Sequence, residues 1–164
     1  MRKHAILMVF CFTCLLAAGH AYAAISMDVD QNMLDFRAVN PGSTTVLADK
    51  GVYHNIITLT STNNKIWYFK AHLVRPFTSG LNTIPNENFK WECVSIGQGR
   101  GIVTNNINVP TPFTSTPSLI YTSTDTDNTG TPVAMMMRYH LTIPKNQISG
   151  AYDAVIRLTM NEIL

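Results

Sequence analysis

The side chains that could do chemistry are few and widely spaced in this sequence. After the first 23 residues, histidine occurs at His54, His72 and His140, each within a run of alternating polar and apolar residues that is typical of a β-strand. No Gly-X-Ser-X-Gly or His-Glu-X-X-His motif is present, so the sequence offers neither a nucleophile elbow nor a zinc-protease pair. We interpret the three histidines as solvent-facing strand residues.

Two glutamates and one cysteine are the next candidates. Glu87 and Glu92 could form the carboxylate pair of a glycosidase, but acids at this density are expected without any such role. Cys93 lies in the strand-like stretch 91–94, and we interpret it as a buried thiol because unpaired cysteine is among the most buried residue types. An intermolecular disulfide is the alternative role of Cys93. The sequence therefore predicts no catalytic residue and a chain that is not an enzyme.

Two loops resemble ligand-binding motifs. Residues 97–101 read Gly-Gln-Gly-Arg-Gly, but a phosphate-binding loop is followed by a helix, whereas residues 102–104 favour a strand. We predict a flexible hairpin tip there. Asp125, Asp127 and Asn128 precede a turn glycine as in the first half of an EF-hand loop, yet Met136 stands where the bidentate glutamate belongs. A plain turn is expected, with a weak calcium loop as the alternative, and no cofactor or metal site is predicted.

The aromatic residues suggest one further kind of site. Trp67 shares a face of its predicted strand with Phe69, which places Trp67 in the core. Tyr68 points the other way, beside Lys70, and could contribute to a sugar-stacking platform on that face. Trp91 is compatible with either role.

Alternation of apolar and polar residues indicates the elements that must position these side chains. Strands are predicted at residues 25–29, 33–39, 52–62, 66–74, 89–95, 118–123, 133–143 and 152–160, and the last two are predicted to form a hairpin. A turn at residues 40–42 and further Gly- and Pro-containing turns separate them. This pattern predicts an all-β fold, an immunoglobulin-like two-sheet antiparallel sandwich of about seven or eight strands, with a closed barrel as the alternative.

The first 23 residues have the form of a signal peptide. A basic start at Arg2 and Lys3 precedes an apolar run over residues 5–18 and the small-residue pattern Ala21-Tyr22-Ala23. Cleavage is expected after Ala23, with Ala24 as the alternative site, which leaves residues 24–164 as one domain. An uncleaved membrane anchor is the other interpretation, but the run is shorter than the about 20 residues that span a bilayer.

Removing the leader changes the charge and the cysteine count. The net charge of +2 rests on 12 basic and 10 acidic residues, and the leader holds two of the basic ones, so the remaining charges balance. A balanced surface does not attract nucleic acid or anionic membrane in general. Cys93 is then the only cysteine, so no internal disulfide is expected.

Several short motifs carry a resemblance to a group of bacterial domains. They are Asp35-Phe36 before Asn40-Pro41-Gly42, the stretch 59–63 before Trp67, Phe77-Thr78-Ser79-Gly80 with Ile84-Pro85 before Trp91, and Ile143-Pro144 before Ser149-Gly150-Ala151-Tyr152. The stretch 36–160 resembles exported WxL-like and fimbria-like immunoglobulin-type domains. Trp67 is followed by Tyr68-Phe69, so the Trp-X-Leu signature itself is not met, and no Leu-Pro-X-Thr-Gly sorting signal occurs. The resemblance implies a surface or extracellular role with no catalytic residues.

These observations predict a secreted or cell-surface structural or adhesive protein, such as a fimbria-like subunit. A periplasmic location is the alternative address, and a secreted ligand-binding module, for example for carbohydrate, is the alternative function. The expected partners are other copies or other surface proteins joined by β-strand pairing. Ile25, Met27 and Val29 alternate ahead of a hinge-like stretch at 30–32, and this strand could pair within its own sheet or extend the sheet of a neighbour.

Overall fold

This computed structural model describes residues 24–162, so the predicted signal peptide at 1–23 lies outside the described residues. Within that range the regular structure consists of strands and two short 3-10 helices. The helices, η1 (Asn86–Asn88) and η2 (Asp125–Asn128), are single turns between strands. No helix in residues 24–162 has the length and apolar character needed to cross a membrane.

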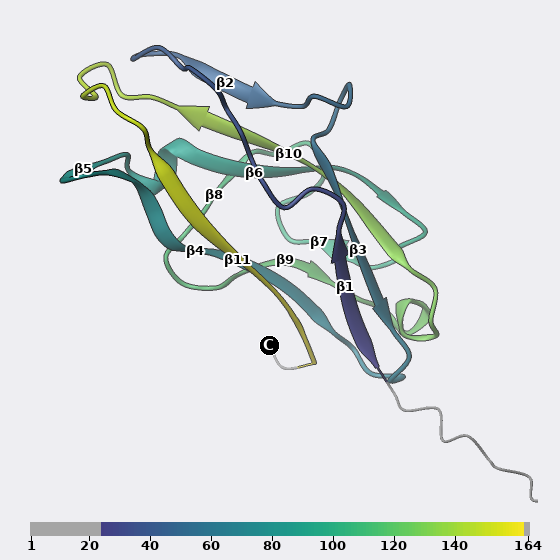
Figure 1. The fold of residues 1–164 in the computed structure, drawn as a ribbon. Coiled ribbons are helices and arrows are strands. Elements are labelled where there is room, and N and C mark those ends of the chain that lie inside the picture. The colour runs from purple at the N-terminus through teal and green to yellow at the C-terminus, as the bar shows by residue number, and fades with distance from the viewer. Residues whose placement is uncertain (1–23, 163–164) are drawn as a thin grey trace, which may run out of the picture.

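The strands form two antiparallel sheets that face each other (Figure 1). Sheet A has the order β1 (Ile25–Val29), β3 (Asn55–Ser61), β10 (Val133–Thr142), β6 (Phe89–Gly97) and β8 (Thr111–Pro112), and β2 (Thr44–Leu47) also pairs with β10. Sheet B has the order β11 (Asp153–Asn161), β4 (Tyr68–Ser79), β9 (Ser118–Thr122) and β7 (Ile102–Val103), and β5 (Asn82–Thr83) also pairs with β4. The predicted all-β, two-sheet antiparallel class is confirmed.

The core lies between the sheets because each long strand alternates apolar and polar residues. On β10 the five inward side chains are at most 4% exposed: Val133, Met135, Met137, Tyr139 and Leu141. On the sheet B side Trp67 packs against Tyr121, with 5.3 Å between ring centroids, and on the sheet A side Phe89 stacks on Phe113 at 4.6 Å. Across the core Phe77 of β4 packs edge-on against Phe89 of β6 at 5.0 Å. Trp91 is also buried, so both tryptophans are core residues.

One predicted strand, at residues 33–39, is wrong. This segment is extended but unpaired, and it crosses from the end of β1 to β2 along the side of the sandwich (Figure 1). Phe36 is buried where the segment crosses and packs edge-on against Phe77 and Phe89. Arg37 has a φ of 56°, a left-handed conformation that interrupts a strand. The strand forms later, as β2, after the Asn40-Pro41-Gly42 turn.

The predicted C-terminal hairpin is also wrong. β10 belongs to sheet A and β11 belongs to sheet B, where β11 pairs with β4. Both strands do alternate as expected, but their apolar faces meet across the core instead of lying side by side in one sheet. Alternation identifies the buried face of a strand and leaves its neighbour undetermined, which is why the pairing was missed.

Replacing Trp67 by alanine should destabilise the fold by about 3–5 kcal/mol, the range for truncating a large buried aromatic side chain. Trp67 is 0% exposed, and its indole Nε1 donates a hydrogen bond to the Asp127 carbonyl at 3.3 Å. Urea unfolding followed by circular dichroism measures the loss. Val52→Ala, at a side chain 59% exposed, is the control and should change little. A loss below about 1 kcal/mol for Trp67→Ala would contradict its role in the core.

Candidate functional site

β11 is paired along only one of its two sides. Its register with β4 runs from Asp153 opposite Thr78 to Asn161 opposite Tyr68, and no other strand in residues 24–162 pairs with it. The strand is nine residues long, and it lies at the border of sheet B (Figure 1). An edge of this length presents a row of backbone N–H and C=O groups on which a further strand can form.

The inward side chains of β11 are apolar but incompletely covered. Ala154, Ile156, Leu158 and Met160 pack against the core, yet each remains partly exposed. The inward residues of β10, by contrast, are fully buried, because strands flank β10 on both sides. Ile156 and Leu158 therefore contact the core, but each remains partly exposed.

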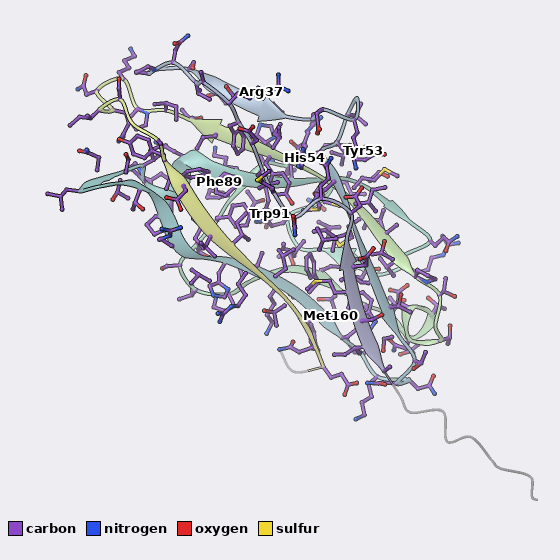
Figure 2. The ribbon with its side chains drawn as sticks, in the orientation of Figure 1. Arg37, Tyr53, His54, Phe89, Trp91 and Met160 are labelled. Atoms are coloured by element: carbon purple, nitrogen blue, oxygen red, sulfur yellow. The ribbon has the colours of Figure 1, made fainter. Side chains whose placement is uncertain are left out.

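A groove separates β11 from the facing border of sheet A. At one end, a hollow of about 270 Å³ lies between residues 25–27 of β1 and residues 158–160 of β11. Farther along, a hollow of about 420 Å³ is lined by residues 152–156, by residues 32–35 and by Phe77 and Phe89. Figure 2 shows Met160 on β11 beside β1. We call these two hollows together the edge groove.

The crossing segment, residues 30–39, forms one wall of the edge groove, and three polar contacts hold its first residues to the start of β3 and to the loop before it. The imidazole Nε2 of His54 lies 3.1 Å from the Met33 carbonyl oxygen, and the Asn55 side-chain amide donates to the Gln31 carbonyl at 2.9 Å. Lys50 forms an ion pair with Asp30 at 2.5 Å. Burial by itself raises the pKa of Asp30, but Lys50 and the backbone amides of Ile56 and Gln31 outweigh it, so the pKa is lowered. This wall is therefore a fixed part of the fold.

The three histidines do not converge on one site. His54 is buried at 4% exposure (Figure 2), so its predicted exposure is wrong; its Nδ1 contacts the Asp49 carboxylate at 2.5 Å. His140 lies on the outer face of sheet A, partly buried against Glu92. His72 is on the outer face of sheet B, opposite Arg157.

Glu92 is buried in an ion-pair cluster on the outer face of sheet A. It accepts hydrogen bonds from Arg138 Nε at 2.6 Å and Nη2 at 2.5 Å, and it contacts His140 at 2.5 Å. Burial alone raises the pKa of Glu92, but the hydrogen bonds and charges of Arg138 and His140 outweigh it, so the pKa is lowered. Glu87 is exposed in η1, and the structure pairs Glu92 with these two bases and not with Glu87.

The glycine-rich loop at 97–101 packs onto Tyr121, which corrects the expectation of a flexible tip. The Gly101 amide donates to the Tyr121 hydroxyl at 2.7 Å. A Cβ atom at Gly99 or Gly101 would lie within 2.8 Å of neighbouring atoms, so both positions require glycine for space. This loop is part of the tertiary packing and does not form a phosphate cradle followed by a helix.

The Asp125–Asn128 turn uses its oxygens within the protein. The Asp127 carboxylate, which is buried, accepts from the Arg100 amide at 2.9 Å, the Tyr121 hydroxyl at 2.8 Å and the Thr124 amide at 2.9 Å. Burial and this hydrogen bond to Asp127 raise the pKa of Tyr121, which keeps it protonated as the donor. Asp125 is exposed, and within residues 24–162 no group of three or more His, Cys, Asp or Glu side chains could hold a metal ion.

Cys93 is a buried side chain of the core, as predicted. It is 0% exposed and lies opposite Met137 in the pairing of β6 with β10. Burial raises the pKa of the Cys93 thiol to about 12, so the thiolate does not form near neutral pH.

Sequence reasoning missed both the open side of β11 and the ion pair between Glu92 and Arg138. The alternation of β11 is plain in the sequence, but a strand with one neighbour has the same pattern as a strand with two. The ion pair depends on the register between β6 and β10, which contains a bulge at Met136 and Met137. No local pattern specifies that bulge.

Gly101→Ala should destabilise the protein, since its Cβ would lie 2.1 Å from the Thr122 carbonyl oxygen and 2.6 Å from the Tyr121 ring. Gly97→Ala is the matched control, because its Cβ would meet Ala134 at an ordinary 3.6 Å. Thermal unfolding of both variants measures the difference. Equal melting temperatures for the two variants would show that the loop is not packed onto Tyr121.

Glu92→Gln should lower stability at neutral pH and reduce the dependence of stability on acid. The lowered pKa of Glu92 means that its ionised form stabilises the folded state above the ordinary value of 4.5, and that this contribution is lost as the pH falls through the folded-state pKa. Urea unfolding at pH 7 and at a series of acidic pH values measures both effects. A variant whose stability falls with acid as steeply as that of the wild type would contradict the ion-pair assignment.

Comparisons with known proteins found a similar structure but no similar sequence. No protein-family model and no curated protein sequence matches the chain. Among solved structures it is similar to a family 123 glycoside hydrolase from Clostridium perfringens, studied for glycolipid glycan hydrolysis, with 13% identity and a TM-score of 0.43 over 85% of this chain and 25% of that one. The chain thus spans about a quarter of that enzyme's length. The expectation that the chain is not an enzyme is withdrawn in view of this finding.

Proposed function

We propose that this chain is a subunit of exported bacterial surface material, fimbria-like in its assembly, and that it joins its neighbours by β-strand pairing in the edge groove. The observation that carries the proposal is the unpaired side of β11. Along it, four inward apolar side chains remain partly exposed over a strand of nine residues. A strand added there would complete the backbone hydrogen bonds and cover those side chains together.

The occupant we propose is the first strand of a second copy, residues 24–31. Its apolar residues Ile25, Met27 and Val29 recur at every second position, which matches the spacing of the inward residues on β11. In its own molecule β1 is an edge strand with five residue pairs to β3, and Ile25 and Met27 are each still 37% exposed. Four of the five residues of β1 are exposed.

Binding of a fluorescent peptide with the sequence of residues 24–31 to protein comprising residues 24–164 tests the proposal. Fluorescence polarisation should show saturable binding, and light scattering should show assembly that grows with protein concentration. Leu158→Lys places a charge in the groove and should weaken peptide binding by about tenfold or more, because the charge loses water when the strand adds.

Asn161→Lys is the matched control for Leu158→Lys. It adds the same charge to β11 at a residue opposite Tyr68 that lines neither hollow of the edge groove, and it should leave peptide binding nearly unchanged. A scrambled peptide with adjacent apolar residues should bind poorly. Equal losses for the two lysine variants, or a protein that stays monomeric at high concentration and binds no peptide, would reject the proposal.

A further inference from the structure

The outer face of sheet B carries a row of basic residues beside an aromatic ring. Lys70 and His72 alternate with the buried residues of β4 and therefore point outward. On the neighbouring strand β11, Arg157 lies directly opposite His72, and Thr159 lies opposite Lys70. Tyr68 continues the row, with the Lys70 Nζ atom 6.0 Å from its ring centroid. We call Tyr68, Lys70, His72 and Arg157 the basic row.

Two residues of the basic row, His72 and Arg157, lack an acidic partner among the described residues: no carboxylate lies within ion-pair distance of either. The carboxylates at the two ends of β11 are engaged elsewhere: Asp153 pairs with Arg75, and Glu162 pairs with Lys65. Two basic side chains placed directly opposite each other on adjacent strands repel when both are charged. An external anion would relieve that repulsion.

His72 adds an independent sign that a polar partner is missing. Its Nδ1 atom is buried and has no hydrogen-bond partner within residues 24–162. A buried polar atom without a partner costs free energy, which a hydrogen bond from a ligand or an ordered water recovers.

We propose that the basic row is a binding site for an anionic polysaccharide, with Lys70 and Arg157 contacting acidic groups and Tyr68 stacking on an apolar sugar face. The outward residues of one strand repeat about every 6.6–6.8 Å, so the row presents its charges along a line, as suits an extended chain with regularly spaced acids. An aromatic ring at the end of a charged row is suited to a ligand with both acidic groups and flat apolar faces.

Other anionic polymers fit the basic row less well. Membrane surfaces are held by clusters of about four to eight Lys or Arg residues, more than this row holds. Nucleic acid binding rests on a broad excess of positive charge, whereas the charges of residues 24–164 balance. An acidic polysaccharide, with its lower charge density, is therefore the ligand class that we infer.

This site is distinct from the edge groove. Arg157 belongs to β11, but it projects outward while Ile156 and Leu158 project into the groove, because successive residues of a strand alternate between its faces. A strand bound in the groove and a polysaccharide bound on the outer face can therefore be present together. Failure of one proposal leaves the other standing, since Leu158→Lys tests the groove alone.

Affinity electrophoresis tests the inference with the protein comprising residues 24–164. Native gels containing polygalacturonate or dextran sulfate should retard the protein, and gels containing neutral dextran should not. Retardation should fall steeply as salt is added. The double variant Lys70→Gln/Arg157→Gln should weaken binding by about tenfold or more, since two charge-assisted contacts are lost. Tyr68→Ala should weaken binding without changing the charge.

The matched control is Lys90→Gln/Lys145→Gln, which removes the same charge away from sheet B and should leave retardation in place. Equal losses in the two double variants would show general charge attraction and overturn the inference. So would the absence of retardation by both acidic polymers, equal retardation by neutral dextran, or binding to phosphatidylglycerol vesicles without binding to polygalacturonate.

Discussion

The structure depends on apolar contact between two sheets that no strand pairing joins in the described residues. Each sheet satisfies its own backbone groups through antiparallel ladders, but neither can bury its apolar face alone. Rings contribute to this contact: Phe77 of β4 packs edge-on against Phe89 of β6, with 5.0 Å between ring centroids, and Phe36 packs against both of them. The loops and the crossing segment cover the two sides of the sandwich, where this contact ends.

The two borders of the sandwich are closed to different degrees. Near η2, the Asp127 carboxylate gathers amide and hydroxyl donors from three segments, and glycine at 99 and 101 lets the loop lie flat on Tyr121. Beside β11, by contrast, the covering element is an unpaired crossing segment fixed through His54 and Asn55. The first border is fully packed, whereas the second leaves apolar side chains partly in water, which is why the proposed assembly site lies there.

The sequence predicts the position and the buried face of each strand better than it predicts which strands pair with each other. The alternation of β10 and β11 is so regular that their buried faces could be predicted residue by residue, and Trp67 follows from the same argument. Residues 33–39 also alternate, but there the left-handed turn at Arg37 and the burial of Phe36 take the segment out of the sheet. Sheet assignment depends on contacts between distant segments, so the hairpin prediction was wrong although both of its strands were correct.

The candidate sites differ in the same way. Tyr68 and Lys70 could be placed on one outer face from β4 alone, but Arg157 joins them only through the register of β11. Glu92 was considered as an acid with a catalytic partner, whereas long-range pairing surrounds it with bases. Residue type and local spacing thus predict which face a side chain occupies. They do not predict the charge that it meets there.

The one-sided pairing of β11 divides its backbone amides into two sets. In an antiparallel ladder, successive residues direct their N–H groups alternately to the two flanking sides. On β11 one set points to β4 and the other to water, whereas over much of β10 both sets are bonded within sheet A. Hydrogen exchange along β11 therefore alternates between slow and fast from one residue to the next. If a further strand paired with the open edge of β11, the fast-exchanging amides would become slow and the alternation would disappear.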